Sequence, residues 1–146
     1  TAAYAALDDA IKEKLDGQSA IHSYRYRYEM MVDAGVRPRQ SEETMASWHE
    51  VQHPIVRSHP ETGRKALFIN EGFTSRISGW PKDASDSMLK RLYSHCTNNR
   101  FLYSHQWQAK DFVLWDNRCT MHCATPYDLN CERTMHRATI TGSKPV

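Results

Sequence analysis

The spacing of apolar residues divides the chain into an N-terminal part with helical periodicity and a C-terminal part of short strand-like runs. Apolar residues recur every three or four positions from Tyr4 to Leu15, which predicts a surface helix over residues 2–15. The segment Tyr24–Tyr28 alternates aromatic and basic residues, and we expect a lid or a packed loop there. Ser41 is typical of a residue that caps a helix N-terminus, so a short helix is expected after it.

Two strands, a turn and one longer helix are expected in the middle of the chain. Residue types in His53–Arg57 and Lys65–Asn70 favour strands, and His59–Gly63 between them contains the proline and glycine of a tight turn. Ser85 is placed to cap a helix that presents one apolar stripe. That stripe consists of Met88, Leu89, Leu92, Tyr93 and Cys96.

Four strand-like runs follow one another closely in the C-terminal third. They are Phe101–Trp107, Phe112–Trp115, Cys119–Ala124 and Arg133–Ile140, and a longer connection at Pro126–Glu132 precedes the last. Short strands separated by turn residues are typical of a sandwich or a jelly roll. The pattern therefore predicts a mainly β fold with flanking helices.

Length and charge restrict the class of ligand. A chain of 146 residues fits one domain, and it also fits a piece of a larger domain. The formal net charge of +2 divides into −2 in residues 1–73 and +4 in residues 74–146, which suits a small anion better than a nucleic-acid backbone. Stacking of the run at Tyr24–Tyr28 on nucleic acid bases is a weaker alternative.

The sequence favours a cytoplasmic location. No apolar stretch approaches the ~18–20 residues that a membrane span needs. Thr1–Ala10 lacks the basic and apolar regions of a signal peptide. The four cysteines are too sparse for a disulfide scaffold, so we expect a reducing compartment.

Two arginines near the C-terminus have an unusual predicted placement. Side chains alternate along a strand, so Arg133 and Arg137 would share one face, roughly 13 Å apart. Inside a sandwich each guanidinium would need an anion. The alternative is that both lie on a solvated face and pair with Asp or Glu.

Two other chemistries are weaker. Cys119, His122, Cys123 and Cys131 are possible zinc ligands, but the sequence has no Cys-x-x-Cys pair. Strand alternation also places His122 opposite Cys119 and Cys123. A Cys–His nucleophile lacks a third group placed to orient the base.

Several segments together resemble one enzyme family. Trp115–His122 and Glu132–Thr139 closely resemble the C-terminal signature of the taurine dioxygenase and 2,4-dichlorophenoxyacetate dioxygenase family. His53–Arg64, Leu67–Thr74 and the opening Thr1–Leu7 are similar to the same family. Its members are Fe(II)- and 2-oxoglutarate-dependent oxygenases, so the resemblance implies a double-stranded β-helix (jelly roll), with Fe(II) as cofactor and 2-oxoglutarate and O2 as cosubstrates.

The resemblance also implies roles for individual residues. His122 matches the distal histidine of the two-His-one-carboxylate iron triad. Arg133 matches the arginine that binds the far carboxylate of 2-oxoglutarate, where a planar guanidinium suits bidentate pairing. Arg137 matches the position that meets the anionic end of the substrate, and Phe73 matches an aromatic that lines the substrate pocket. The residues expected to build the strand and turn that aim the histidine are Trp115 and Asn117.

One departure from the family pattern concerns the other two iron ligands. The family has a His-x-Asp pair on an earlier strand, and this sequence contains no His-x-Asp. His59-Pro60-Glu61 is a formal substitute, but the family's matching stretch is a turn, and we reject it as a ligand pair. We therefore expect the C-terminal portion of a longer enzyme. Residues 1–50 would belong to its helical or loop insertion or lid, and residues 51–146 to the C-terminal half of an incomplete jelly roll.

These observations predict a dioxygenase that hydroxylates a small anionic organic substrate and releases succinate and CO2. The candidate substrates are an alkylsulfonate such as taurine, a sulfate ester or an aryloxyalkanoate, because Arg137 requires only an anion. Asn70–Thr74 favours the taurine-like branch, whereas Gly79–Pro81 and Cys119–His122 favour the phenoxyacetate branch. The alternative is a non-catalytic jelly-roll binding module that has lost the metal site. We expect no nucleic-acid or membrane partner, while a homo-oligomer is compatible with the sequence.

Overall fold

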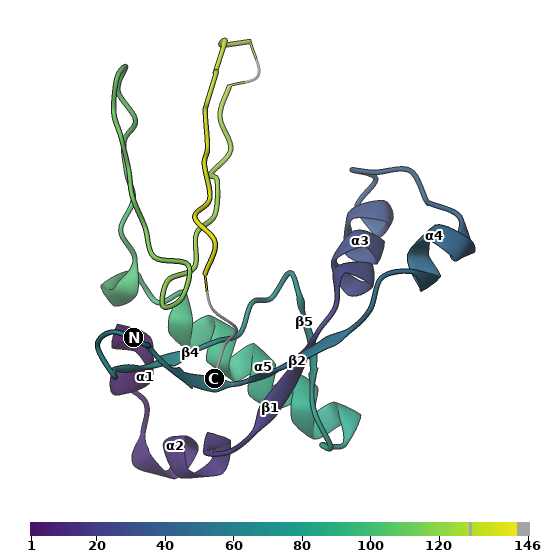
Figure 1. Cartoon of the computed structure of the whole chain (residues 1–146), viewed down its shortest axis with the longest axis vertical. Coiled ribbons are helices and arrows are strands. Elements are labelled where there is room, and N and C mark those ends of the chain that lie inside the picture. The colour runs from purple at the N-terminus through teal and green to yellow at the C-terminus, as the bar shows by residue number, and fades with distance from the viewer. Residues whose placement is uncertain (129, 143–146) are drawn as a thin grey trace.

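The computed structural model describes residues 1–128 and 130–142 (Figure 1). Residue 129, inside the predicted connection Pro126–Glu132, and residues 143–146 lie outside the described residues. The helices are α1 (Ala2–Ala5), α2 (Asp9–Leu15), α3 (Tyr24–Asp33), α4 (Glu42–Ala46) and α5 (Lys82–Cys96), followed by a 3₁₀ turn, η1 (Asn99–Phe101). The strands are β1 (Ser19–His22), β2 (Val51–Pro54), β3 (Val56–Ser58), β4 (Lys65–Leu67) and β5 (Thr74–Ile77).

The strands form two small antiparallel sheets. In the larger sheet β1 is central, with β2 on one side and β5 on the other. In the smaller sheet β3 pairs with β4, and Arg57 lies opposite Ala66. Residue 55 separates β2 from β3, so the predicted strand His53–Arg57 is divided between the two sheets, and the predicted strand Lys65–Asn70 is shorter than expected.

One hydrophobic core joins these elements. It is built by side chains from α1, α2, β1, β5, α5 and the segments between them, so residues on both sides of position 50 contribute to it. The assignment of residues 1–50 to an insertion or lid of the family fold stays a prediction. None of the described helices combines the length and the apolar character that a membrane-spanning segment requires. The buried residues of this core are Leu7, Ile11, Leu15, Ala20, Ile55, Ile69, Ile77, Met88, Leu89 and Leu92.

The single helix predicted over residues 2–15 is wrong, because the chain forms two helices there. Asp8 has an extended backbone conformation, with φ of −61° and ψ of 143°, and stands at the N-terminal cap of α2. Aspartate favours this position because it competes with helical hydrogen bonding in a helix interior. Leu7 and Ile11 still face the core, as their spacing predicted.

The aromatic and basic run Tyr24–Tyr28 is also not a loop, since it begins α3. The side-chain oxygen of Ser23 accepts a hydrogen bond from the backbone N–H of Tyr26, which caps this helix. Tyr28 is buried and its ring lies 5.0 Å from that of Trp48, between centroids. The run is therefore part of a packed helix.

Three local predictions concern caps and turns, and two of them are confirmed. Ser41 caps α4 by accepting from the backbone N–H of Thr44, and Gly63, with φ of 65°, lies in the hairpin turn between β3 and β4. Ser85, however, does not cap α5, which begins three residues earlier. Ser85 is buried, and its oxygen accepts from the backbone N–H of Ile77 at 2.8 Å, so it ties α5 to β5. The predicted apolar stripe of α5 is confirmed.

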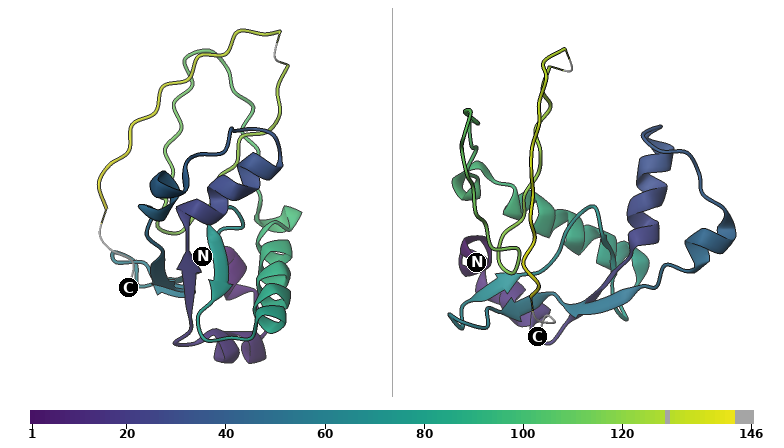
Figure 2. Two further views of the ribbon diagram at one scale, coloured as in Figure 1. Left: turned by 90° about the vertical axis from the view of Figure 1, so that its right-hand side faces the viewer. Right: turned by 45° about the horizontal axis from the view of Figure 1, so that its top comes forward.

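Two long extended segments leave this body on the same side (Figures 1 and 2). We call residues 102–115 the first arm and residues 121–142 the second arm, and residues 116–120 form the turn between them. The four strands predicted here are not formed in the described residues. A strand needs a neighbour that takes up its backbone N–H and C=O groups, and no described segment provides one along either arm. The arms carry the exposed apolar side chains Leu102, Tyr103, Trp107, Phe112, Leu114, Met121, Tyr127, Met135 and Ile140.

Candidate functional site

His122, the predicted iron ligand, lies at the start of the second arm and is exposed. Its ring contacts that of Trp115, with 4.8 Å between centroids. Trp115 Nε1 in turn donates to Oδ1 of Asn117 at 2.9 Å. Within residues 1–128 and 130–142 neither nitrogen of His122 has a hydrogen-bond partner, so each is available to a ligand.

The two predicted anion-binding arginines lie further along the second arm. Arg133 and Arg137 are both exposed. The guanidinium of Arg133 lies 5.1 Å from the centroid of the Tyr127 ring. In the described part of the chain neither arginine forms an ion pair, whereas Arg76 and Arg118 each meet carboxylates. The alternative prediction is that both arginines lie on a solvated face and pair with Asp or Glu. Both are exposed, but among the described residues neither pairs with a carboxylate.

Phe73 lies away from the arms, directly before β5, and its side chain is 40% exposed. Its backbone is held on both sides, because its carbonyl accepts from the N–H of Ser23 at 2.8 Å and its N–H donates to the carbonyl of Asn70 at 3.0 Å. No hydrogen bond, ion pair or ring contact among the described residues joins Phe73, His122, Arg133 and Arg137 to one another. Their roles stay predictions.

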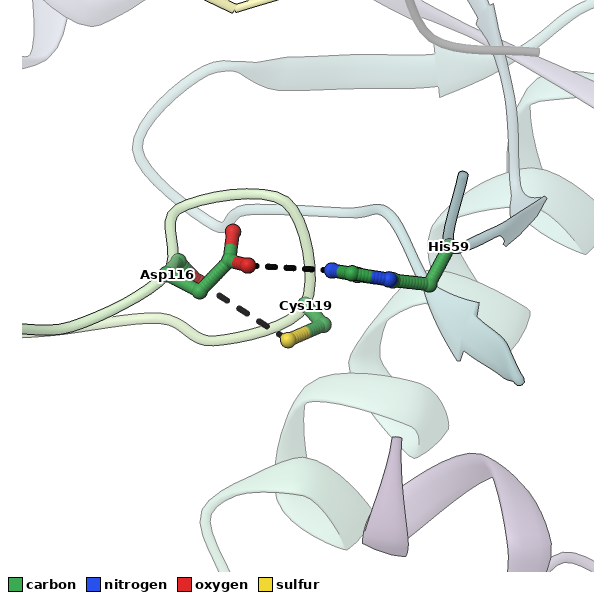
Figure 3. Close-up of side chains that lie close together, drawn as sticks. All are labelled: His59, Asp116 and Cys119. Carbon is green, nitrogen blue, oxygen red and sulfur yellow. Dashed lines mark hydrogen bonds and ion pairs between the residues drawn. The ribbon is translucent and has the colours of Figure 1, made fainter. Parts of the chain in front are cut away.

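The turn between the arms is fastened to the β3–β4 hairpin by a contact that the sequence analysis missed. His59 Nε2 and Asp116 Oδ2 are 3.0 Å apart, and the close-up shows the imidazole pointing at the carboxylate (Figure 3). Arg118 donates to both oxygens of Asp116 and, through Nη1, to Glu61 at 2.7 Å. Hydrogen bonds from Arg118 and then from His59 hold the pKa of Asp116 well below its usual range.

Cys119 lies beside His59 and Asp116, and the three side chains together are of the types that bind metal ions. His59, Asp116 and Cys119 present ligand atoms within 4.8 Å of one another, the one such group in the described residues (Figure 3). His59 Nδ1, however, accepts from the backbone N–H groups of Glu61 and Thr62, at 3.3 and 3.2 Å. Nε2 therefore carries the proton and donates it to Asp116, which leaves no lone pair for a metal.

The contacts of this turn also concern two metal-binding hypotheses from the sequence, the His59–Glu61 ligand pair and the zinc site. The formal ligand pair His59 and Glu61 is engaged in the hairpin turn and in the ion pair with Arg118, as the rejection of that pair anticipated. The possible zinc ligands His122, Cys123 and Cys131 do not gather with Cys119 into a metal-binding group in the described residues. All four cysteines have free thiols.

A second polar cluster surrounds the ring of Phe68. The rings of His22 and His53 lie 5.6 and 5.5 Å from it, and the guanidinium of Arg57 lies 4.9 Å from its centroid. Burial, and secondarily the neighbouring His53, lowers the pKa of His22 to about 4. Arg57 is only 2% exposed, and its Nε and Nη2 have no partner in the described residues. Local spacing does not reveal this cluster, because its members come from three different strands and a loop.

A cleft of about 430 Å³ between α3 and α5 is separate from all of these residues. Its lining includes Tyr26, Glu71, Lys90 and Tyr93. None of the four residues predicted for the site lines it.

Comparison with known proteins decides the family. The model of the family described as taurine catabolism dioxygenase TauD, TfdA family matches residues 1–139. This chain belongs to the TauD/TfdA family. The resemblance found in the sequence is therefore confirmed, and it extends over nearly the whole chain.

Two curated relatives of this TauD/TfdA chain are named for different substrates. The α-ketoglutarate-dependent 2,4-dichlorophenoxyacetate dioxygenase of Burkholderia sp. (strain RASC) is 34% identical, over 98% of this chain and 46% of the relative. A putative α-ketoglutarate-dependent sulfonate dioxygenase of Schizosaccharomyces pombe (strain 972 / ATCC 24843) is 37% identical, over 99% of this chain and 36% of the relative. The chain thus spans half or less of the length of these two relatives.

A solved structure establishes the fold. The crystal structure of AAD-2 in complex with Mn(II) and N-oxalylglycine superposes with a TM-score of 0.86 at 33% identity, over 99% of this chain and 55% of that chain. The chain accordingly forms part of the jelly-roll fold of the TauD/TfdA family.

Proposed function

We propose that this chain belongs to an Fe(II)- and 2-oxoglutarate-dependent dioxygenase that hydroxylates a small anionic organic substrate. The observation that supports the proposal most directly is the second arm. In a TauD/TfdA chain, it carries an imidazole with both nitrogens unengaged and two guanidinium groups without a protein carboxylate in the described residues. Such groups suit a metal and two separate anions.

His122 fits the role of an iron ligand because it is exposed and makes no hydrogen bond to described residues. Two further ligands, the His-x-Asp pair of the family pattern, would come from residues outside this sequence. Bound Fe(II), with 2-oxoglutarate as cosubstrate, supplies the activation of O2. The residues of this chain bind, orient and neutralise charge.

Arg133 and Arg137 divide the two anions between them in this proposal. Arg133 holds the far carboxylate of 2-oxoglutarate, since a guanidinium can donate two parallel hydrogen bonds to a carboxylate. Arg137 holds the anionic end of the substrate. Phe73, exposed at the edge of the body, contributes apolar surface to the substrate pocket. The division keeps cosubstrate and substrate from competing for one guanidinium.

The substrate is an alkylsulfonate, a sulfate ester or an aryloxyalkanoate. The two relatives are named for a sulfonate and for 2,4-dichlorophenoxyacetate, and all three candidates carry an anion for Arg137. Hydroxylation of the carbon that bears sulfur in a sulfonate gives an aldehyde and sulfite. Hydroxylation of the carbon that bears the ether oxygen in an aryloxyalkanoate gives a phenol and an oxo acid. The product therefore identifies the substrate class.

The test uses the full-length protein with Fe(II), 2-oxoglutarate and O2. Succinate formation is measured with taurine, an alkyl sulfate and 2,4-dichlorophenoxyacetate, together with release of sulfite, sulfate or phenol. Substrate-dependent succinate that is abolished in His122→Ala supports the proposal. Binding of one of these anions without any turnover of 2-oxoglutarate would overturn it in favour of a non-catalytic binding module.

Location and assembly complete the proposal. The four free thiols suit the reducing cytoplasm, where we place the protein. Assembly into a homo-oligomer is checked by analytical ultracentrifugation of the same full-length protein.

A further inference from the structure

Four side chains from two distant turns form a closed ring of interactions. We call them the clasp: His59 and Glu61 from the β3–β4 hairpin, and Asp116 and Arg118 from the turn between the arms. His59 contacts Asp116, Asp116 accepts from Arg118, and Arg118 meets Glu61. The ring closes where the backbone N–H of Glu61 donates to Nδ1 of His59.

The clasp has a defined arrangement of protons. Two backbone N–H groups point at Nδ1 of His59, so this ring is neutral with its proton on Nε2. Asp116 Oδ1 accepts from the backbone N–H and Nε of Arg118, at 2.8 and 2.9 Å, and Oδ2 accepts from Nη2 at 2.7 Å. Both oxygens of Asp116 and Nδ1 of His59 thus have donors, and His59 is only 6% exposed. A satisfied network of this kind holds one geometry.

The turn that the clasp holds leads directly to His122. The carbonyl of Asp116 accepts from the backbone N–H groups of Cys119 and Thr120, at 3.3 and 3.1 Å, and from the hydroxyl of Thr120 at 2.6 Å. On the other side of the turn, Trp115 contacts the His122 ring. Asp116 therefore organises the turn through its backbone while its side chain fastens the turn to the body.

Among the described residues, one contact outside the clasp also reaches this turn, a hydrogen bond of 3.3 Å from the amino group of Thr1 to the carbonyl of Cys119. The second arm has no strand pairing and no buried residue among its described positions. The hairpin, by contrast, is continuous with the core through Ile55 and Ala66. The clasp is thus the side-chain connection through which the hairpin, and the core behind it, influences where the second arm begins.

We propose that the clasp is a positioning device for His122: it transmits the rigidity of the β3–β4 hairpin to the imidazole that binds the metal. His59, Glu61, Asp116 and Arg118 are positioning residues in this proposal, which rests on the proposed function for the identity of the metal ligand. Groups that orient metal ligands indirectly typically change affinity by about 10–100-fold when they are removed.

The test compares two substitutions of His59 in the full-length protein. Glutamine places an amide N–H close to Nε2 and keeps a donor for Asp116, whereas leucine keeps the volume and removes the donor. We expect His59→Leu to weaken Mn(II) binding in the presence of 2-oxoglutarate roughly tenfold, and His59→Gln to restore most of that loss. Affinity is measured by calorimetry without O2, so no turnover is needed.

A second pair of variants avoids any change to the buried ring. Glu61→Gln weakens the clasp at an exposed carboxylate, and Glu50→Gln weakens a similar carboxylate–arginine pair, with Arg76, outside it. We expect weaker Mn(II) binding from Glu61→Gln and wild-type binding from Glu50→Gln. In metal-free protein, NMR of the His122 ring protons reports the contact with Trp115, and only the clasp variant should shift them.

The outcomes separate the two proposals. Wild-type protein that fails to bind Mn(II), or His122→Ala that binds it as well as wild type, contradicts the proposed function. Mn(II) binding that depends on His122 but is equal in wild type, His59→Leu and Glu61→Gln, with unmoved His122 resonances, overturns the clasp as a positioning device.

Discussion

His59 and Asp116, 57 positions apart in the sequence, are joined by a hydrogen bond of 3.0 Å between Nε2 and Oδ2. One belongs to a hairpin anchored in the hydrophobic core, and the other begins the turn that leads to His122. The contact connects the part of the chain that has its own core with the part that carries His122, Arg133 and Arg137 of the proposed site.

Arg133→Ala should raise the KM for 2-oxoglutarate at least tenfold, because the cosubstrate carboxylate loses a charge-assisted, bidentate partner. Arg133→Lys should give an intermediate value, since it keeps the charge without the planar fork. The measurement is the rate of succinate formation by the full-length protein as 2-oxoglutarate is varied, with Arg76→Ala as a control arginine that pairs with Glu50. An unchanged KM in Arg133→Ala would reject the assigned role.

Arg137→Ala should leave uncoupled turnover of 2-oxoglutarate close to wild type. It should weaken binding of the primary substrate at least tenfold. The reason is that this guanidinium is assigned to the anion of the substrate and not to the cosubstrate. Succinate formation is measured without substrate and across a substrate titration. A parallel loss of both activities would show that the two arginines do not divide the anions as proposed.

Ser85→Ala should lower the free energy of unfolding by about 1–3 kcal/mol, because the buried N–H of Ile77 loses its acceptor. Ser94→Ala, at an exposed position of the same helix, is the matched control and should stay within about 0.5 kcal/mol of wild type. Urea denaturation followed by circular dichroism gives both values. Equal effects of the two substitutions would mean that the Ser85 hydrogen bond does not stabilise the fold.

Stability should fall as the pH is lowered from about 6.5 to about 4 because of His22. Its pKa is about 4 in the folded chain, against 6.5 for the unfolded side chain, so the unfolded state binds the extra proton in this interval. The free energy of unfolding therefore has its full value above pH 6.5, as far as His22 is concerned. The loss between pH 6.5 and pH 4 amounts to at most about 3 kcal/mol, since His22 is only partly buried.

The measurement compares wild type with His22→Gln by denaturation at pH 7 and pH 4.5. In His22→Gln, the free energy of unfolding should differ much less between the two pH values than in wild type. His49→Gln, at an exposed histidine, should keep the wild-type difference. A difference that survives in His22→Gln would assign the acid sensitivity to other groups.

Tertiary context also explains the predictions that failed. The residue types of the four C-terminal runs favour strands, yet the described arms form none, because a strand exists only where a second segment accepts and donates along it. Ser85 has the chemistry of a cap, but its oxygen is taken by Ile77 of β5. The run at Tyr24–Tyr28 is helical because Ser23 caps it and Tyr28 packs on Trp48.

The sequence by itself determined features whose cause lies within a few residues, and its segments also identified the family. The Ser41 cap, the turn that ends in Gly63 and the apolar stripe of α5 are of this kind, since each depends on local conformational preference or on periodicity. Only the tertiary structure decided that β1 lies between β2 and β5, that Arg57 is buried, and that His59 meets Asp116. Those relationships depend on packing between segments far apart in the chain, which local spacing does not encode.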